Sequence, residues 1–271
     1  MHPIEHLRFV ARATGADAGL LVQEAAQALA VFDRDPAALV TACRRLLTRQ
    51  PGVGPLWWMA SRLVTAGDAR DAARSVVDDL ADDRTARELS HALPGGATVA
   101  IAGWPDLAVA ALRRRGDVSV VVVDVEGQGH GAVRSLERVD VEAEAVDAAR
   151  LAGVVEGADV VLIEAGAVGS AAALTDIGSL SLAAVARATG TPVWLVAGMG
   201  RALPDVVWNE LVDRVVDPDA LPWTADHEVV GLGLVDRVVG WSGPVDPDGV
   251  GTLLAGAGVV PSAPELLVPL R

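Results

Sequence analysis

Apolar residues recur at helical spacing through the first third of the chain. Two such sets are Leu20, Leu21, Ala25, Ala28 and Leu29, followed by Leu39, Val40, Cys43, Leu46 and Leu47. Side chains spaced in this way lie on one face of a helix. Asp35–Pro36 and Gln50–Pro51–Gly52 break the pattern, because proline cannot continue a helix. The pattern predicts stacked helices over residues 3–93, the last one running from Asp68 to Leu93.

After Pro94–Gly95–Gly96 the pattern changes to short apolar runs separated by amphipathic segments. The runs predict strands near residues 97–102, 118–124, 139–142, 159–164, 192–197 and 213–216. Strands that alternate with helices are typical of a parallel, doubly wound sheet. We therefore predict an α/β protein with a helical N-terminal domain, residues 1–94, and a Rossmann-like domain, residues 95–271. Between residues 217 and 239 the pattern is irregular and predicts loops with a late strand pair.

The segment from residue 157 to residue 204 predicts a βαβ unit. A continuous apolar run fills residues 159–165, and a helix is expected to begin near Thr175 or Asp176. Gly190–Thr191–Pro192 ends that helix, and a second buried strand follows. In such sheets ligands bind at the carboxyl ends of the strands. The loops after the predicted strands are therefore where a functional site is expected.

This segment resembles a superfamily that contains the alpha, beta and delta subunits of translation initiation factor 2B, methylthioribose-1-phosphate isomerase and ribose-1,5-bisphosphate isomerase. The resemblance lies in Gly157–Asp159, in DIGSLSLA from Asp176 to Ala183, and in TPVWLV from Thr191 to Val196. Weaker similarity around residues 46–58 and 244–258 extends it to about residues 37–260. The resemblance implies a helical domain before a Rossmann-like domain, and self-association as a homodimer or larger assembly.

The resemblance also implies which chemistry is missing. In the isomerases a cysteine and an aspartate act on the sugar carbons, and an Asn-Lys pair and an arginine lie beside the phosphate. The matching positions here are Trp104 for the cysteine, Gly166 for the aspartate, Thr175–Asp176 for Asn-Lys, and Gln50, with Arg49 adjacent, for the arginine. Removal of one proton-transfer group typically slows such a reaction ~100-fold to 10,000-fold. We therefore expect a degenerate isomerase site.

Four residues remain as candidate acid–base groups if an enzyme with relocated chemistry is present. Glu164 ends a predicted buried strand, so a raised pKa is expected for it. Asp106 begins the helix after the first strand, where it either caps the helix or takes part in catalysis. Asp124 and His130 belong to a loop after the second strand, and His130 can exchange a proton near neutral pH. The alternative interpretation of that loop is a flexible connection.

Candidate ligand contacts surround the same strand ends. Gly129 lets backbone N–H groups approach an anion, and Trp104 either stacks on a ring or fills the place of the missing cysteine. Ser179 replaces a threonine that lies close to the ligand in the superfamily, while Asp176 adds negative charge that repels phosphate. Arg201 is either a surviving anion contact or an ordinary exposed arginine.

Composition narrows the remaining function classes. The formal net charge is -14, with no lysine and with arginines densest at Arg113–Arg115. This charge argues against a nucleic-acid surface, which needs clustered basic residues. Cys43, the only cysteine, excludes a multi-cysteine metal site and indicates the cytoplasm. We expect no metal, cofactor or membrane contact.

Two functions stay open at this point. The first is a non-isomerising protein that binds a phosphorylated sugar or nucleotide, or acts through assembly. The second is an active sugar-phosphate isomerase with relocated acid–base residues. A nicotinamide-dependent oxidoreductase is disfavoured because Ala102–Gly103–Trp104–Pro105 lacks the glycine spacing of a dinucleotide fingerprint.

Overall fold

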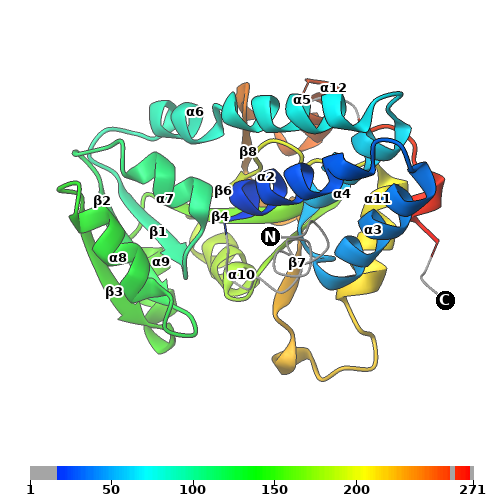
Figure 1. Ribbon diagram of the computed structural model, residues 1–271. Helices are drawn as coiled ribbons and strands as arrows, with labels where there is room; N and C mark the ends of the chain where they lie inside the picture. The colour runs from blue at the N-terminus through cyan, green and yellow to red at the C-terminus, as the bar shows by residue number, and fades with distance from the viewer. Residues whose placement is uncertain (1–16, 257–259, 269–271) are drawn as a thin grey trace.

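The computed structural model describes residues 17–256 and 260–268 (Figure 1). The first part of the described chain is helical. Its helices are α2 (Ala18–Leu29), α3 (Pro36–Arg49), α4 (Gly54–Thr65) and α5 (Ala69–Ala81), with a 3-10 turn at Ala30–Phe32. Asp17, Asp35 and Asp68 precede three of these helices, and each carboxylate accepts a hydrogen bond from a first-turn N–H group. Such caps satisfy amides that have no partner inside the helix.

The α/β part follows and holds nine strands among the described residues. In chain order it contains α6 (Thr85–Ala92), β1 (Thr98–Ala102), α7 (Asp106–Leu112), β2 (Ser119–Asp124), α8 (Gly129–Glu137), β3 (Glu142–Asp147), α9 (Leu151–Glu156), β4 (Val160–Val168), β5 (Ala172–Asp176), α10 (Ser179–Thr189), β6 (Val193–Val196), α11 (Asp205–Val215), β7 (His227–Gly231), β8 (Arg237–Gly240), β9 (Gly243–Val245) and α12 (Val250–Gly256).

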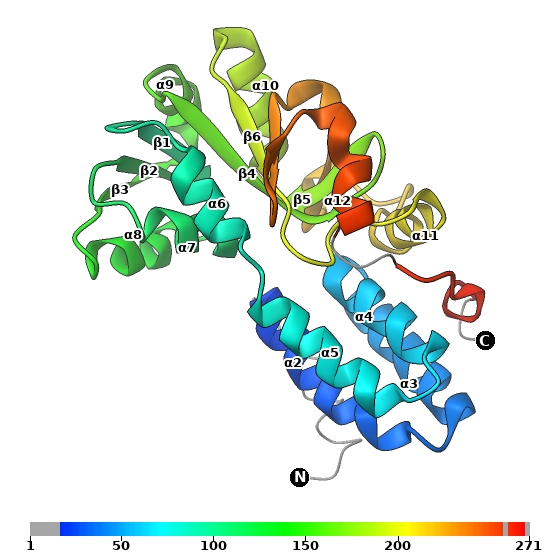
Figure 2. The same cartoon turned by 90° about the horizontal axis from the view of Figure 1, so that it is seen from above.

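The main sheet has the order β3-β2-β1-β4-β6-β8-β9 and is parallel except for β9. Beyond its pairing with β6, strand β4 continues and pairs antiparallel with β5, which pairs antiparallel with β7. Alternate residues of β1 point to opposite faces, with Val99 and Ile101 packed against one cluster and Ala100 against another. Helices α6, α7 and α8 cover the first face, and α9, α10 and α12 contribute to the second (Figure 2).

The helical part shares its core with distant segments of the chain. Trp57 and Trp58 of α4 are fully buried and lie in one cluster with residues of α2, α3 and α5. The same cluster includes Trp208 of α11 and Leu266 near the end of the described chain. Cys43 is buried there as well, and burial raises the pKa of its thiol to about 12. Cys43 therefore lies on the buried face of α3, as its place in the helix-spaced apolar set predicts.

Most predicted elements are present, but several differ. The predicted strand at residues 213–216 is wrong, because this stretch largely lies in α11. The predicted helix start at Thr175–Asp176 is also wrong, because these residues end β5 and the helix begins at Ser179. The helix expected from residue 68 to residue 93 is divided into α5 and α6. The third strand runs from Glu142 to Asp147 rather than over 139–142.

Three further expectations need comment. The late strands β7 and β8 exist, yet they pair with β5 and β6 rather than with each other. The predicted helical residues 3–16 lie outside the described part of the chain. The boundary between residues 94 and 95 stays a prediction, and α6, which precedes it, packs against α7 and β9. None of the described helices combines the length and apolar content needed to span a bilayer.

Candidate functional site

Glu164 lies at the centre of the carboxyl edge of the sheet. It is the last residue of β4 that pairs with β6, opposite Val196. Its Oε2 accepts hydrogen bonds from the N–H groups of Leu107 and Ala108, at 2.8 and 3.1 Å. These amides belong to the first turn of α7, whose N-cap residue, Pro105, has no side-chain acceptor. Glu164 therefore supplies from a neighbouring strand the cap that α7 lacks.

Arg201 holds the other oxygen of this carboxylate. Its Nη1 donates to Oε1 of Glu164 at 2.7 Å and also to the backbone carbonyl of Ala165. The two side chains are only 9% and 10% exposed, so the interpretation of Arg201 as an ordinary exposed arginine is wrong. Burial raises the pKa of Glu164, as expected, and Arg201 and the two amides oppose that shift. Both carboxylate oxygens face N–H donors, and this arrangement favours the ionised form.

Asp106 lies beside this pair in the first turn of α7. Burial raises the pKa of Asp106 to about 7, and the negative charges of Glu164, Asp17 and Asp176 act in the same direction, while Arg201 opposes them. Asp17 comes from the helical part, so acidic groups of both parts of the chain meet near α7. Because Glu164 makes the cap, the interpretation of Asp106 as the capping residue is not supported. A carboxyl group with this pKa can give or take a proton near neutral pH.

A second carboxylate, that of Asp124 at the end of β2, caps the start of α8 in the same way. Its Oδ1 accepts the N–H of Gly129, the first residue of α8, at 2.7 Å. His130 is 66% exposed, and its Nε2 lies 4.0 Å from Asp124 Oδ2. The amide of Gly129, a candidate anion contact, is therefore already bonded to a residue of the same loop.

The ring of Trp104 packs against the first turn of α8. A Cβ at Gly131 would come within 2.7 Å of the Trp104 ring, so the absence of a side chain at Gly131 makes room for the indole. The Trp104 side chain is held there with 39% of the residue exposed. Its ring thus packs beside the start of α8, and its part in ligand stacking stays a prediction.

The third helix start also receives a carboxylate of the chain. Glu228 of β7 accepts the N–H of Leu180, in the first turn of α10, at 2.7 Å. Ser179, the first residue of α10, is buried. Asp176 lies at the end of β5 with its Oδ1 3.4 Å from His227 Nδ1. The helices α7, α8 and α10 therefore all start with an amide bonded to an internal carboxylate.

A side chain does not fit at Gly166, the position where the resemblance implies an aspartate. A Cβ at this position would lie 2.9 Å from the carbonyl oxygen of Gly52, and a Cβ at Gly54 would lie 2.7 Å from the carbonyl oxygen of Gly166. The turn after α3 is thus packed backbone to backbone against β4 and leaves no room for a side chain. Arg49 is exposed in the last turn of α3 and makes no hydrogen bond or ion pair with any described residue.

Sequence reasoning missed three residues at this edge: Asp17, Glu228 and Asp83. The Oδ2 of Asp83, between α5 and α6, accepts the N–H of Met199 at 2.9 Å, which fixes the loop that carries Arg201. None of these contacts is local in sequence, so no spacing could have revealed them. Within the described residues, no group of three His, Cys, Asp or Glu side chains is placed to hold a metal ion.

The sequence matches no protein-family model and no curated protein. Solved structures are similar, however. A translation initiation factor 2B from Pyrococcus horikoshii superposes with a TM-score of 0.72 at 14% identity, covering 90% of this chain and 97% of that one. The beta subunit from Chaetomium thermophilum gives 0.72 at 16% identity over 99% and 93% of the two chains.

An enzyme is also among the similar structures. The 5-methylthioribose 1-phosphate isomerase of Pyrococcus horikoshii has a TM-score of 0.68 at 14% identity, covering 94% of this chain and 88% of that one. At these identities the likeness establishes the fold alone. The predicted arrangement of a helical N-terminal part and a mainly parallel sheet is thereby confirmed.

Proposed function

We propose that this protein, which has the fold of the translation initiation factor 2B subunits and of 5-methylthioribose 1-phosphate isomerase, acts through assembly of protein chains and does not isomerise a sugar phosphate. One observation carries the proposal. The three helix starts at the carboxyl edge are each bonded to a carboxylate of the chain, namely Glu164, Asp124 and Glu228. Helix starts are the usual anchors for phosphate in such folds.

The electrostatics of the edge support the same conclusion. Arg201 is a cation beside the start of α7, and Glu164 already neutralises it at 2.7 Å. A phosphate placed there would have to displace Glu164 and would meet the negative charges of Asp106 and Asp176. Repulsion between like charges in a partly buried site is costly. An anionic ligand is thus disfavoured by the carboxylates that surround the groups able to bind it.

Assembly fits the fold. A similar solved structure is the tetrameric beta2-delta2 complex of initiation factor 2B from C. thermophilum, with a TM-score of 0.72 at 17% identity. We propose that this chain also self-associates, as a homodimer or a larger homo-oligomer, in the cytoplasm. Its single cysteine, Cys43, is buried and fits a reducing compartment.

The experiment restores an anion site by removing Glu164. We expect Glu164→Ala to free Arg201 and two α7 amides, so that the variant binds inorganic phosphate with a Kd of ~1 mM. At 10 mM phosphate this gives ~1.4 kcal/mol of stabilisation. Thermal unfolding should therefore show a phosphate-dependent rise in the Tm of the variant and none in the wild type.

The control variant is Glu137→Gln, which changes an exposed glutamate at the end of α8. It should respond to phosphate as the wild type does. The wild type is also screened with ribose phosphates, methylthioribose 1-phosphate and nucleoside monophosphates. If the wild type is stabilised by a sugar phosphate and converts it, as followed by NMR, the proposal is wrong.

A second function is favoured by one specific observation. The pKa of Asp106 is about 7, a value that suits a general acid or base near neutral pH. With Asp124 and His130 on the adjacent loop, Asp106 would serve a sugar-phosphate isomerase with relocated acid–base groups. NMR turnover that is present in the wild type and lost in Asp106→Asn would support this function over the first.

A further inference from the structure

Residues 217–226, the arm, project from the body between α11 and β7 (Figure 1). All ten of these residues are exposed. Within the described chain, the hydrogen bonds of the arm all close inside it, for example from Ala220 N–H to the Asp217 carbonyl and from Thr224 N–H to the Leu221 carbonyl. The arm therefore has its own local structure and no anchor on the rest of the fold.

The tip of the arm is apolar and pre-ordered. Trp223 is 79% exposed and Leu221 is 54% exposed. Leu221 directly precedes the 3-10 turn Pro222–Thr224, and Trp223 lies in it. Pro218 restrains the preceding backbone. Tryptophan is the side chain most enriched among residues that dominate protein interfaces, and prior ordering lowers the entropic cost of binding. These features indicate a docking element.

The charged residues of the arm indicate which kind of surface it can bind. Asp217, Asp219 and Asp226 flank the apolar tip, and the arm contains no arginine. A complementary surface must combine space for an indole with basic side chains. Elsewhere in the chain arginine repeatedly covers tryptophan, at 4.8 to 5.6 Å from guanidinium carbon to ring centre, in the pairs Arg62–Trp58, Arg84–Trp241, Arg214–Trp57 and Arg237–Trp194. No such arginine covers Trp223 within the described residues.

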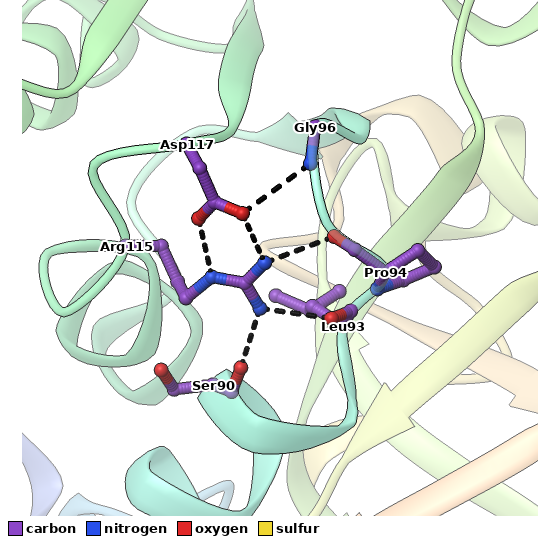
Figure 3. Close-up of polar contacts among 6 residues, drawn as sticks. All are labelled: Ser90, Leu93, Pro94, Gly96, Arg115 and Asp117. Carbon is purple, nitrogen blue, oxygen red and sulfur yellow. Dashed lines mark hydrogen bonds and ion pairs between the residues drawn. The ribbon is translucent and has the colours of Figure 1, made fainter.

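A basic concavity of about 490 Å³ lies between the ends of α6 and α7. Its lining residues are Arg87, Ser90, His91, Leu93, Arg114 and Arg115. Figure 3 shows that the Arg115 guanidinium is already fully used: it donates to Asp117 and to the backbone carbonyls of Ser90, Leu93 and Pro94. The Arg115 side chain is thus held in place by these bonds and has no N–H group left for a partner.

Arg114 remains available. It is exposed, and its side chain makes no hydrogen bond or ion pair with any described residue. Among the residues that the structure describes, Arg87 pairs only with the neighbouring Glu88, at 2.9 Å. The concavity therefore offers at least one free guanidinium together with space for a ring, in a chain whose net charge is otherwise strongly negative.

We propose that the arm of one copy seats in the basic concavity of a second copy, with the Trp223 ring against Arg114 and the flanking aspartates facing Arg87 and His91. This inference deepens the assembly role proposed above and rests on it. The arm and the ends of α6 and α7, which line the concavity, lie at opposite sides of the fold in Figure 1, so the arm of one copy does not fill the concavity of the same copy. A contact between two different surfaces is heterologous and can continue from copy to copy.

Sedimentation velocity of the purified full chain tests this contact. The wild type should form dimers and larger species between 5 and 100 µM in 50 mM salt. Trp223→Ala and Arg114→Glu should each weaken the association at least 10-fold, since both remove a group at the centre of the contact. Val206→Ala, which truncates another exposed apolar residue, should leave it unchanged. Circular dichroism and Tm verify that each variant is folded.

Mixing the two variants gives the sharpest result. Trp223→Ala keeps an intact concavity and Arg114→Glu keeps an intact arm, so an equimolar mixture should form a 1:1 dimer that does not grow further. A wild type that stays monomeric overturns this contact. So does an oligomer indifferent to both variants, although the assembly role then stands through another face. Weakening by Trp223→Ala alone indicates arm-to-arm pairing or another occupant and also overturns the contact. Turnover of a sugar phosphate by NMR would overturn the proposed function and leave this contact intact.

Discussion

The pH dependence of stability caused by Asp106 gives a quantitative test of the electrostatics at the carboxyl edge of the sheet. The pKa of Asp106 is about 7 in the folded protein, compared with an ordinary value of 3.8. The folded state therefore holds the proton more tightly than the unfolded chain does. The free energy of unfolding should fall as pH rises from about 4 to about 7, and the loss should be complete by pH 8. The physical cause is burial of the carboxylate first, and then repulsion from Glu164, Asp17 and Asp176.

The magnitude follows from the displacement of the pKa. A displacement of about three units corresponds to ~4 kcal/mol. Because Asp106 is only partly buried, solvent screening reduces this to ~1–2 kcal/mol. Asparagine keeps the shape and removes the charge. Asp106→Asn should therefore raise the free energy of unfolding by ~1–2 kcal/mol at pH 8, and by less than half of that at pH 5.

Urea denaturation followed by tryptophan fluorescence at pH 5, 6.5 and 8 measures the effect. Asp213→Asn, an exposed residue of α11 without a hydrogen-bond partner among the described residues, is the matched control and should show no such pH dependence. The reasoning is refuted if Asp106→Asn is less stable than the wild type at pH 8. It is also refuted if the gain is the same at pH 5 and pH 8.

Four further predictions concern stability, all measured by urea denaturation at pH 7. Arg201→Met should lower the free energy of unfolding by ~3–5 kcal/mol because it leaves Glu164 buried without its partner, and adding Glu164→Gln should recover part of the loss. Gly198→Ala should cost ~1–3 kcal/mol, because a Cβ there would lie 2.5 Å from a side-chain carbon of Leu107. Gly153→Ala in α9, where a Cβ meets nothing within 4 Å, should instead gain ~0.5–1 kcal/mol. Arg115→Lys should cost ~2 kcal/mol, since an ammonium cannot replace a guanidinium bonded on every side; an unchanged midpoint would contradict this.

The central strands could be predicted because their pattern is dictated by burial on both faces. Continuous apolar runs of strand length such as Val160–Ile163, bounded by turn residues, fit the middle of a sheet that is covered on both faces. The resemblance added the order of the two parts. By contrast, the stretch at residues 213–216 is short and mixes charged and apolar residues, so it fits a strand as well as a helix. Only its packing against the helical part decides that it is α11.

The chemistry of the edge was less predictable. Glu164 could be recognised as a buried acid at a strand end, and its raised pKa follows from that position. Its bonds to the α7 amides and to Arg201 join residues 57 and 37 positions apart, and no local pattern encodes such distances. The same holds for Glu228, whose partner in α10 is 48 positions away. Pairing partners depend on the tertiary fold, while propensity and periodicity report only neighbours.

The core of the helical part has a consequence for synthesis of the chain. Helices α2 to α5 are translated before the α/β part, yet their shared cluster also needs Leu211 of α11 and Leu266. Arg44 of α3 donates to the Glu265 carbonyl, and Arg214 to the Leu266 carbonyl. Until about two hundred further residues have been translated, the nascent helices expose an unfinished apolar surface. We therefore expect chaperones to bind the chain during translation, and chains shortened before Leu266 to fail to fold.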